Sequence, residues 1–174
     1  MFRDTTLVTL GQNTRMEIET YVYKPGDRNA AMETRVTEGS FRIMGGAITR
    51  TAPENFKTHA PSGTIGIRGS MYAGLVKEGA LSVLFQGGKG IYVRNSMGSV
   101  DINRPGFGTR IKSGGQPPEK PRKVSEQDVL RMERLLARTP DDPGGDETEP
   151  GDGGDAGMAS LPAPDADPAD NGDA

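Results

Sequence analysis

The sequence contains no cysteine, no tryptophan and one histidine, and these absences exclude several kinds of site. Without cysteine there is no disulfide, no thiolate nucleophile and no cysteine-bound metal. His59 lacks the second histidine of an H-x-x-H metal motif. A catalytic triad would need His59 beside Ser40, Ser62 or Ser70, and no G-x-S-x-G motif supports one. We therefore predict no catalytic, cofactor-binding or metal-binding residues, and no enzyme activity.

Long apolar runs are also missing. No segment approaches the roughly 18 consecutive apolar residues that a membrane-spanning helix needs. Met1 is followed by Phe2-Arg3-Asp4-Thr5-Thr6, which has neither the charged start nor the apolar stretch of a signal peptide. The sequence as written predicts a soluble chain without a targeting segment, and the absence of cysteine does not fix its compartment.

Charge is distributed unevenly along the chain. Residues 1–112 carry 15 basic and 9 acidic side chains, whereas residues 113–174 carry 6 basic and 15 acidic ones. The segment 139–174 has 11 acidic residues, no basic ones and few large apolar ones, which predicts a disordered acidic tail. Basic residues in the first part are dispersed among only four Tyr and five Phe in the whole chain, so we predict no nucleic-acid partner.

Residues 1–112 predict an all-β fold. Side chains in Arg15–Tyr23 should alternate between the two faces of a strand. One face would carry Met16, Ile18 and Val22, and the opposite face would carry Glu17, Glu19 and Tyr21. Short glycine-punctuated strands at roughly ten-residue spacing favour a β-solenoid or roll, with a β-sandwich as the alternative. The further strands expected are Thr34–Thr37, Ser40–Met44, Ala47–Thr49, Phe56–Thr58, Thr64–Arg68, Met71–Val76, Leu81–Phe85, Gly90–Arg94, Ser99–Ile102 and Phe107–Ile111.

The C-terminal part predicts a Pro-rich linker over 113–124 and an amphipathic helix over 125–138. Ser125 can cap the helix, and Pro140 should end it. Its apolar stripe should cover the last strand of the β domain, with recruitment of a partner as the alternative. The stripe consists of Val129, Met132, Leu135 and Leu136.

The segment Thr58–Ser70, which reads THAPSGTIGIRGS, resembles the signature of the FecR domain family. Two other segments are similar to strands of that family, Leu10–Ile18 and Val36–Arg42, and they occur in the expected order. Gly98–Thr109 resembles the way in which such proteins continue. The resemblance covers about residues 1–112, and its signature residues are Thr64, Ile65, Gly66, Ile67, Arg68 and Gly69.

The resemblance implies an extracytoplasmic, non-enzymatic protein-interaction or signal-relay module. Iron-uptake regulators of the family pass a receptor signal to a sigma factor through a transmembrane segment and a cytoplasmic anti-sigma domain. This sequence contains neither, so stand-alone FecR-domain proteins are the closer analogy. Family domains usually carry further strands ahead of the segment similar to Phe2–Leu10, so we expect a longer parent with a periplasmic or extracellular location. The alternative is a structural cell-envelope β-solenoid domain, or a fragment of a larger surface protein.

Arg68 is the residue of the signature with the clearest alternative roles. Ile65 and Ile67 should face the core, which places Arg68 on the opposite side of its strand. There it would either contact a protein partner or tie strands together through its five donors. The glycines of the signature predict close backbone approach rather than a phosphate-binding loop. We expect an unidentified protein partner, bound at a strand face or by β-augmentation of an edge.

Overall fold

The computed structural model describes residues 1–137, so the acidic tail predicted for 139–174 lies outside the described residues. No helix within 1–137 is long and apolar enough to cross a membrane. The described strands are β1 (Leu7–Leu10), β2 (Arg15–Val22), β3 (Ala31–Met44), β4 (Phe56–Ala60), β5 (Gly63–Ile67), β6 (Ser70–Lys77), β7 (Ala80–Gly88), β8 (Ile91–Asn95), β9 (Gly98–Ile102), β10 (Phe107–Ile111) and β11 (Arg122–Lys123). The helical segments are α1 (Ile48–Thr51), η1 (Pro53–Asn55) and α2 (Glu126–Ala137).

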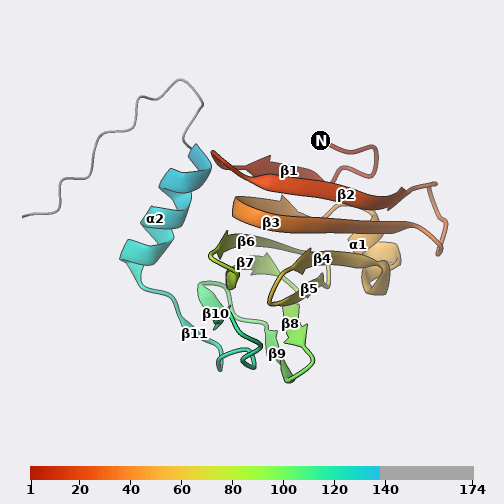
Figure 1. Ribbon diagram of the computed structural model, residues 1–174. Coiled ribbons are helices and arrows are strands. Elements are labelled where there is room, and N and C mark those ends of the chain that lie inside the picture. Colours follow the sequence, from red (N-terminus) through yellow and green to blue (C-terminus); the bar gives the residue numbers. More distant parts are fainter. Residues whose placement is uncertain (138–174) are drawn as a thin grey trace, which may run out of the picture. The chain divides into compact units, whose positions relative to one another are not determined.

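Strand β3 organises the fold, because its two halves have different neighbours. Its first half pairs with β2 on one side and with β4 on the other. Its second half, from Gly39 onward, pairs with β1 and β6. The two separate strands predicted over this region are therefore one 14-residue strand. Along β3, β1 pairs with the second half and β2 with the first, and Figure 1 shows both strands above β3.

The strands form one curled sheet in the order β11-β10-β7-β6-β3-β4-β5-β8-β9, with β1 and β2 also paired to β3. The prediction of an all-β domain with a short C-terminal helix is confirmed. The finer prediction of a β-solenoid is not confirmed, since a solenoid stacks parallel coils. Here the β3–β4 pair is parallel and the other pairs within residues 1–137 are antiparallel. The sheet instead curls into a half-barrel around its apolar core.

The core is filled by side chains from the concave face of this sheet. Tyr72 is fully buried in it, in an edge-to-face contact with Phe41 at 6.2 Å between ring centroids. Its hydroxyl is 2.7 Å from Thr58 Oγ1, which is 2.9 Å from Thr34 Oγ1, so the buried hydroxyls satisfy one another. Burial raises the pKa of the Tyr72 phenol, and the hydrogen bond to Thr58 only partly opposes that effect. The largest fully buried side chains also include Phe56, Phe85, Met32, Ile43, Ile65, Ile67, Leu81 and Ile91.

The alternation predicted for β2 is broken by a β-bulge. The register shifts between Ile18 and Thr20, which leaves Glu19 without an opposite residue on β3. An extra residue reverses the faces of all side chains that follow. Tyr21 therefore packs against the core, and Val22, which was expected to share a face with Met16, points outward.

The strand predicted at Ala47–Thr49 is wrong, because α1 occupies that region. The buried Asp4 holds the chain in this turn, since its carbonyl oxygen accepts the Ala47 N–H at 2.7 Å and its carboxylate accepts the Ile48 N–H at 3.4 Å. Asp4 also accepts two hydrogen bonds from Thr6. These contacts join segments about forty residues apart, so local sequence patterns could not reveal them.

Residues 113–124, predicted as a linker, make several contacts with β10. The Glu119 N–H donates to the Arg110 carbonyl at 2.9 Å, and Thr109 Oγ1 donates to the Glu119 carbonyl at 2.6 Å. Pro118 is buried, and β11 pairs with β10. Helix α2 then begins after Ser125, whose hydroxyl accepts the Asp128 N–H at 3.1 Å as a cap.

Helix α2 packs back onto the strands that precede it. Glu133 on α2 forms an ion pair with Arg42 of β3 and accepts a hydrogen bond from Gln86 of β7. The Ser40 hydroxyl lies 3.4 Å from the Leu135 carbonyl, and Leu136 is buried. Of the predicted stripe, Val129, Met132 and Leu135 are half-buried, and the helix contacts β3 and β7 of its own chain through Glu133 and the Leu135 carbonyl.

Candidate protein-interaction surfaces

The outer side of β1 and β2 is an open edge of the sheet. Within residues 1–137 both strands pair with β3 alone. Their outward N–H and C=O groups are therefore available to an additional strand, as at any sheet edge. Two stretches of chain joined by the short segment 11–14 make up this edge, which runs along the whole length of β3.

The core is incompletely covered at this edge. Leu10 stands opposite Phe41, and Ile18 stands opposite Thr34, in the antiparallel register. Opposite residues share a face, and both partners on β3 are fully buried, so Leu10 and Ile18 are directed toward the core side. They are nevertheless 44% and 51% exposed. Side chains that face the core but remain half exposed mark a place where another element could pack.

The outward face of the edge is partly apolar as well. Leu7 and Met44 are opposite one another across the β1–β3 pair, and both are exposed, as is Val22 on β2. Charged Glu17 and the bulge at Glu19 interrupt β2. Charges and bulges are the features by which native edge strands disfavour indiscriminate pairing. The edge therefore combines apolar surface with features that restrict which strand can join it.

The signature segment is mostly structural in its contacts. Ile65 and Ile67 are fully buried, and Thr64 is 3.1 Å from the His59 ring through its hydroxyl. A side chain on Gly66 would occupy the space of the Tyr92 ring, so glycine allows that ring to pack on β5. Gly69 adopts a positive φ of 72° at the turn between β5 and β6, a conformation that favours glycine.

Arg68 is the exposed member of the signature. Its guanidinium is 3.4 Å from Asp101, and the two side chains are 62% and 66% exposed. An ion pair this exposed contributes little to stability, so the alternative in which Arg68 ties strands together is not supported by its contacts. Arg68 lines a small hollow of about 280 Å³ together with Arg50 and Lys89, which makes this corner basic.

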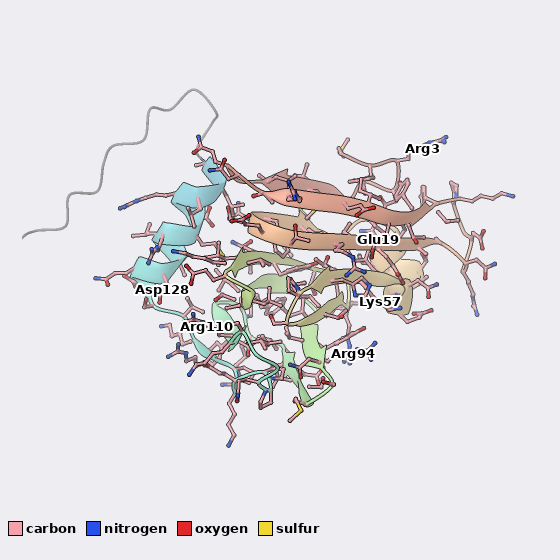
Figure 2. The ribbon with its side chains drawn as sticks, viewed as in Figure 1. Arg3, Glu19, Lys57, Arg94, Arg110 and Asp128 are labelled. Atoms are coloured by element: carbon pink, nitrogen blue, oxygen red, sulfur yellow. The ribbon has the colours of Figure 1, made fainter. Side chains whose placement is uncertain are left out.

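Sequence reasoning missed a polar cluster formed by three strands. Glu19, Glu33 and His59 each offer an atom that could bind a metal, and these atoms lie within 4.8 Å of one another. However, Glu19 pairs with Arg35 at 2.6 Å, and Glu33 pairs with Lys57 at 3.2 Å. Figure 2 shows Glu19 and Lys57 at this position. Because cations already neutralise both carboxylates, we interpret the cluster as an ion-pair network across β2, β3 and β4.

The structure does not bring His59 together with any of the serines considered for a triad. Its Nδ1 is near Thr64, and its Nε2 is 3.6 Å from Glu33. Ser70 Oγ bonds to the backbone of Gly90, and Ser40 Oγ is near the Leu135 carbonyl. Ser62 Oγ is buried and, within residues 1–137, has no hydrogen-bond partner.

Comparisons with known proteins support the fold alone. No family model matches the chain, and no curated protein matches it. Two crystal structures of a candidate anti-sigma factor from Parabacteroides distasonis are similar, with TM-scores of 0.56 and 0.55 and sequence identities of 15% and 16%. Each match covers 74% of this chain and 56% of that chain, so this chain corresponds to little more than half of its structural neighbour. At this identity the likeness establishes that the two proteins share a fold.

Proposed function

We propose that this chain is a non-enzymatic, FecR-like protein-interaction or signal-relay module that acts outside the cytoplasm. Its β1–β2 edge would receive an extended segment of a protein partner. The observation that carries the proposal is the exposure of Leu10 and Ile18, which face the core and yet lack a covering element.

Strand addition at this edge would gain free energy from two sources. A partner strand would pair with the outward backbone groups of β1 and β2, which supplies affinity with little dependence on sequence. Its inward side chains would cover Leu10 and Ile18, and burying a large aliphatic side chain completely is worth roughly 1.5–3 kcal/mol. Since each is about half covered already, roughly 1 kcal/mol remains to be gained at each position.

A role in signalling is supported by two independent likenesses. The segment Thr64–Gly69 resembles the FecR signature, and the structural neighbour from Parabacteroides distasonis is a candidate anti-sigma factor. An edge that can be extended by a partner strand would serve such a role without any catalytic group.

The proposal can be tested by crosslinking in the organism that carries the gene. A photo-reactive amino acid at position 18 should capture one defined protein, whereas the same group at Met97 should not. Met97 is a matched control because it is also an exposed apolar residue, at 63%, and lies in the β8–β9 turn. Equal capture from both positions, or none from position 18, would contradict strand addition at this edge.

Affinity measurements with the captured protein would then show whether Ile18 itself contributes to binding. Ile18→Lys should weaken binding by about tenfold, because a charge would replace an apolar contact in the completed sheet, while Met97→Lys should leave binding unchanged.

Fractionation of cells that express the gene from its own locus tests the location. Recovery in the cytoplasm alone would contradict the extracytoplasmic part of the proposal.

A further inference from the structure

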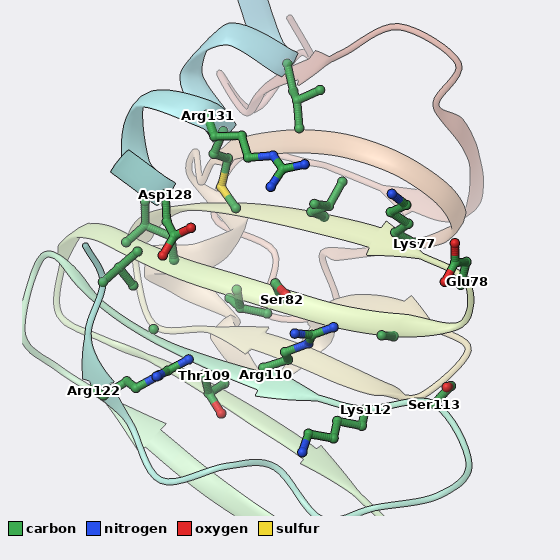
Figure 3. A pocket seen from close by; sticks show the side chains of 18 residues that line it. Lys77, Glu78, Ser82, Thr109, Arg110, Lys112, Ser113, Arg122, Asp128 and Arg131 are labelled. Carbon is green, nitrogen blue, oxygen red and sulfur yellow. The ribbon is translucent and has the colours of Figure 1, made fainter. Parts of the chain in front are cut away.

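A second surface, separate from the β1–β2 edge, lies between α2 and the strands β6, β7 and β10. It is a cleft of about 640 Å³, which is within the range of typical ligand-binding clefts. Figure 3 shows that α2 forms one wall and that the adjoining strands form the floor. The cleft lies beside α2, which Glu133 holds against β3 and β7 near the C-terminal end of the helix.

The lining of the cleft is strongly basic. Five cationic residues contribute to it, and only two acidic ones do, Glu78 and Asp128. Asp128 is already engaged with the capping Ser125, since the Ser125 hydroxyl donates to its carboxylate at 2.7 Å. Within the described part of the chain, none of the five cations forms an ion pair. They are Lys77, Arg110, Lys112, Arg122 and Arg131.

Apolar side chains lie between these charges. Leu75, Leu84 and Met132 are among the lining residues, so the cleft offers apolar surface as well as cations. Arg131 on α2 and Arg110 on β10 extend over it from two different elements, as Figure 3 shows. Guanidinium groups bind carboxylates with two parallel hydrogen bonds, which gives such a site both strength and direction.

We propose that this cleft binds an extended acidic peptide segment of a partner protein, in which carboxylates alternate with apolar residues. The carboxylates would pair with the unpaired cations, and the apolar residues would contact the leucines and Met132. The proposal does not depend on the β1–β2 edge, because the two sites share no residue.

The lining also distinguishes a peptide from a nucleic acid. No aromatic residue is among those that line the cleft. Recognition of single-stranded nucleic acids relies on stacking of bases on aromatic rings, so that contribution would be missing. The apolar floor would likewise be unused by a phosphate backbone. An acidic peptide uses both the cations and the apolar floor.

The test is a binding measurement on the full chain. Fluorescence anisotropy would follow a labelled peptide of alternating glutamate and leucine, with peptides that carry glutamine or lysine in place of glutamate as references. We expect the glutamate peptide to bind and the glutamine and lysine peptides not to bind. Arg110→Glu combined with Arg131→Glu should weaken its binding by about tenfold or more, because two charge-assisted contacts become repulsive. Both side chains are exposed, so the fold should survive, and a thermal melt would verify this.

The matched control is Lys24→Glu combined with Arg28→Glu. These two exposed residues lie between β2 and β3, do not line the cleft, and change the net charge by the same amount. Replacing the 11 acidic residues of 139–174 by their amides gives a second form of the full chain. Tighter peptide binding by that form, lost again with the Arg110 and Arg131 reversals, would support the proposal, because those acidic residues share the chemistry of the peptide.

Three results would overturn the proposal. The first is absence of binding of the glutamate peptide to either form of the chain. The second is an equal loss of affinity in the cleft variant and in the Lys24/Arg28 control, which would show only diffuse attraction by net charge. The third is tighter binding of a DNA duplex than of the peptide, with the same sensitivity to the Arg110 and Arg131 reversals, which would identify the cleft as a nucleic-acid site.

Discussion

Two strands of this domain carry isoleucines that face the same core, and they bury them to very different extents. Ile65 on β5 is fully buried, whereas Ile18 on β2 is 51% exposed. β5 lies between β4 and β8, while β2 has β3 on one side only. Burial is therefore decided here by whether a second strand is present, and not by the type of residue. The unfilled place beside β2 is what makes that edge the candidate for partner binding.

The largest expected effect sets these two positions against each other. Ile65→Ala should lower the free energy of unfolding by roughly 2–5 kcal/mol, since it removes a buried side chain and leaves a cavity. Ile18→Ala should cost less than about 1 kcal/mol, because half of the side chain is already in water. Urea denaturation of both variants measures the difference. Equal losses would mean that the β1–β2 edge is as well covered in solution as the interior is.

The second comparison is between two glycines of neighbouring hairpins. Gly66→Ala should cost about 1–3 kcal/mol, because the new methyl group would occupy the space of the Tyr92 ring and force it away. Gly87→Ala has no neighbouring atom within 4 Å of the added carbon and should change stability little. Thermal unfolding of the two variants provides the measurement. If Gly66→Ala were as stable as Gly87→Ala, the glycine of the signature would need an explanation other than packing.

A smaller effect on the free energy of unfolding should come from the buried Tyr72, and it should appear only in alkaline solution. Because burial raises the pKa of Tyr72 in the folded protein, the unfolded chain releases this proton first, above about pH 10. Stability from this group is therefore complete below pH 10 and falls as the pH rises, by about 1.4 kcal/mol for each pH unit.

The control for this pH effect is Tyr72→Phe, which removes the titrating group and keeps the ring. It should lose about 1 kcal/mol at neutral pH, through the lost hydrogen bond to Thr58. Its free energy of unfolding, measured by circular dichroism at about pH 9 to about pH 11, should then decline less steeply with pH than that of the unaltered protein. This range spans the ordinary tyrosine pKa of about 10. Parallel declines would mean that Tyr72 is accessible to hydroxide in the folded state.

Local patterns in the sequence predicted the elements well and their assembly poorly. The strands from Phe56 to Ile111 and the cap at Ser125 follow from alternation, glycine turns and helix signals within a few residues. The bulge at Glu19 and the turn held by Asp4 depend on partners distant in the chain. The open edge and the basic cleft arise only when β3 exchanges neighbours and α2 folds back, which no single segment encodes.

The smallest effect on stability is expected at Arg68, where the signature meets solvent. Arg68→Ala should change the free energy of unfolding by less than about 0.5 kcal/mol, because its pairing with Asp101 is exposed on both sides. Ile67→Ala, one residue earlier and fully buried, should cost several times more. Chemical denaturation of the two variants would show whether the free energy of unfolding depends on Ile67 much more than on Arg68, as their contacts predict. A large loss from Arg68→Ala would mean that the guanidinium ties strands together after all, and a partner contact at Arg68 would lose its main support.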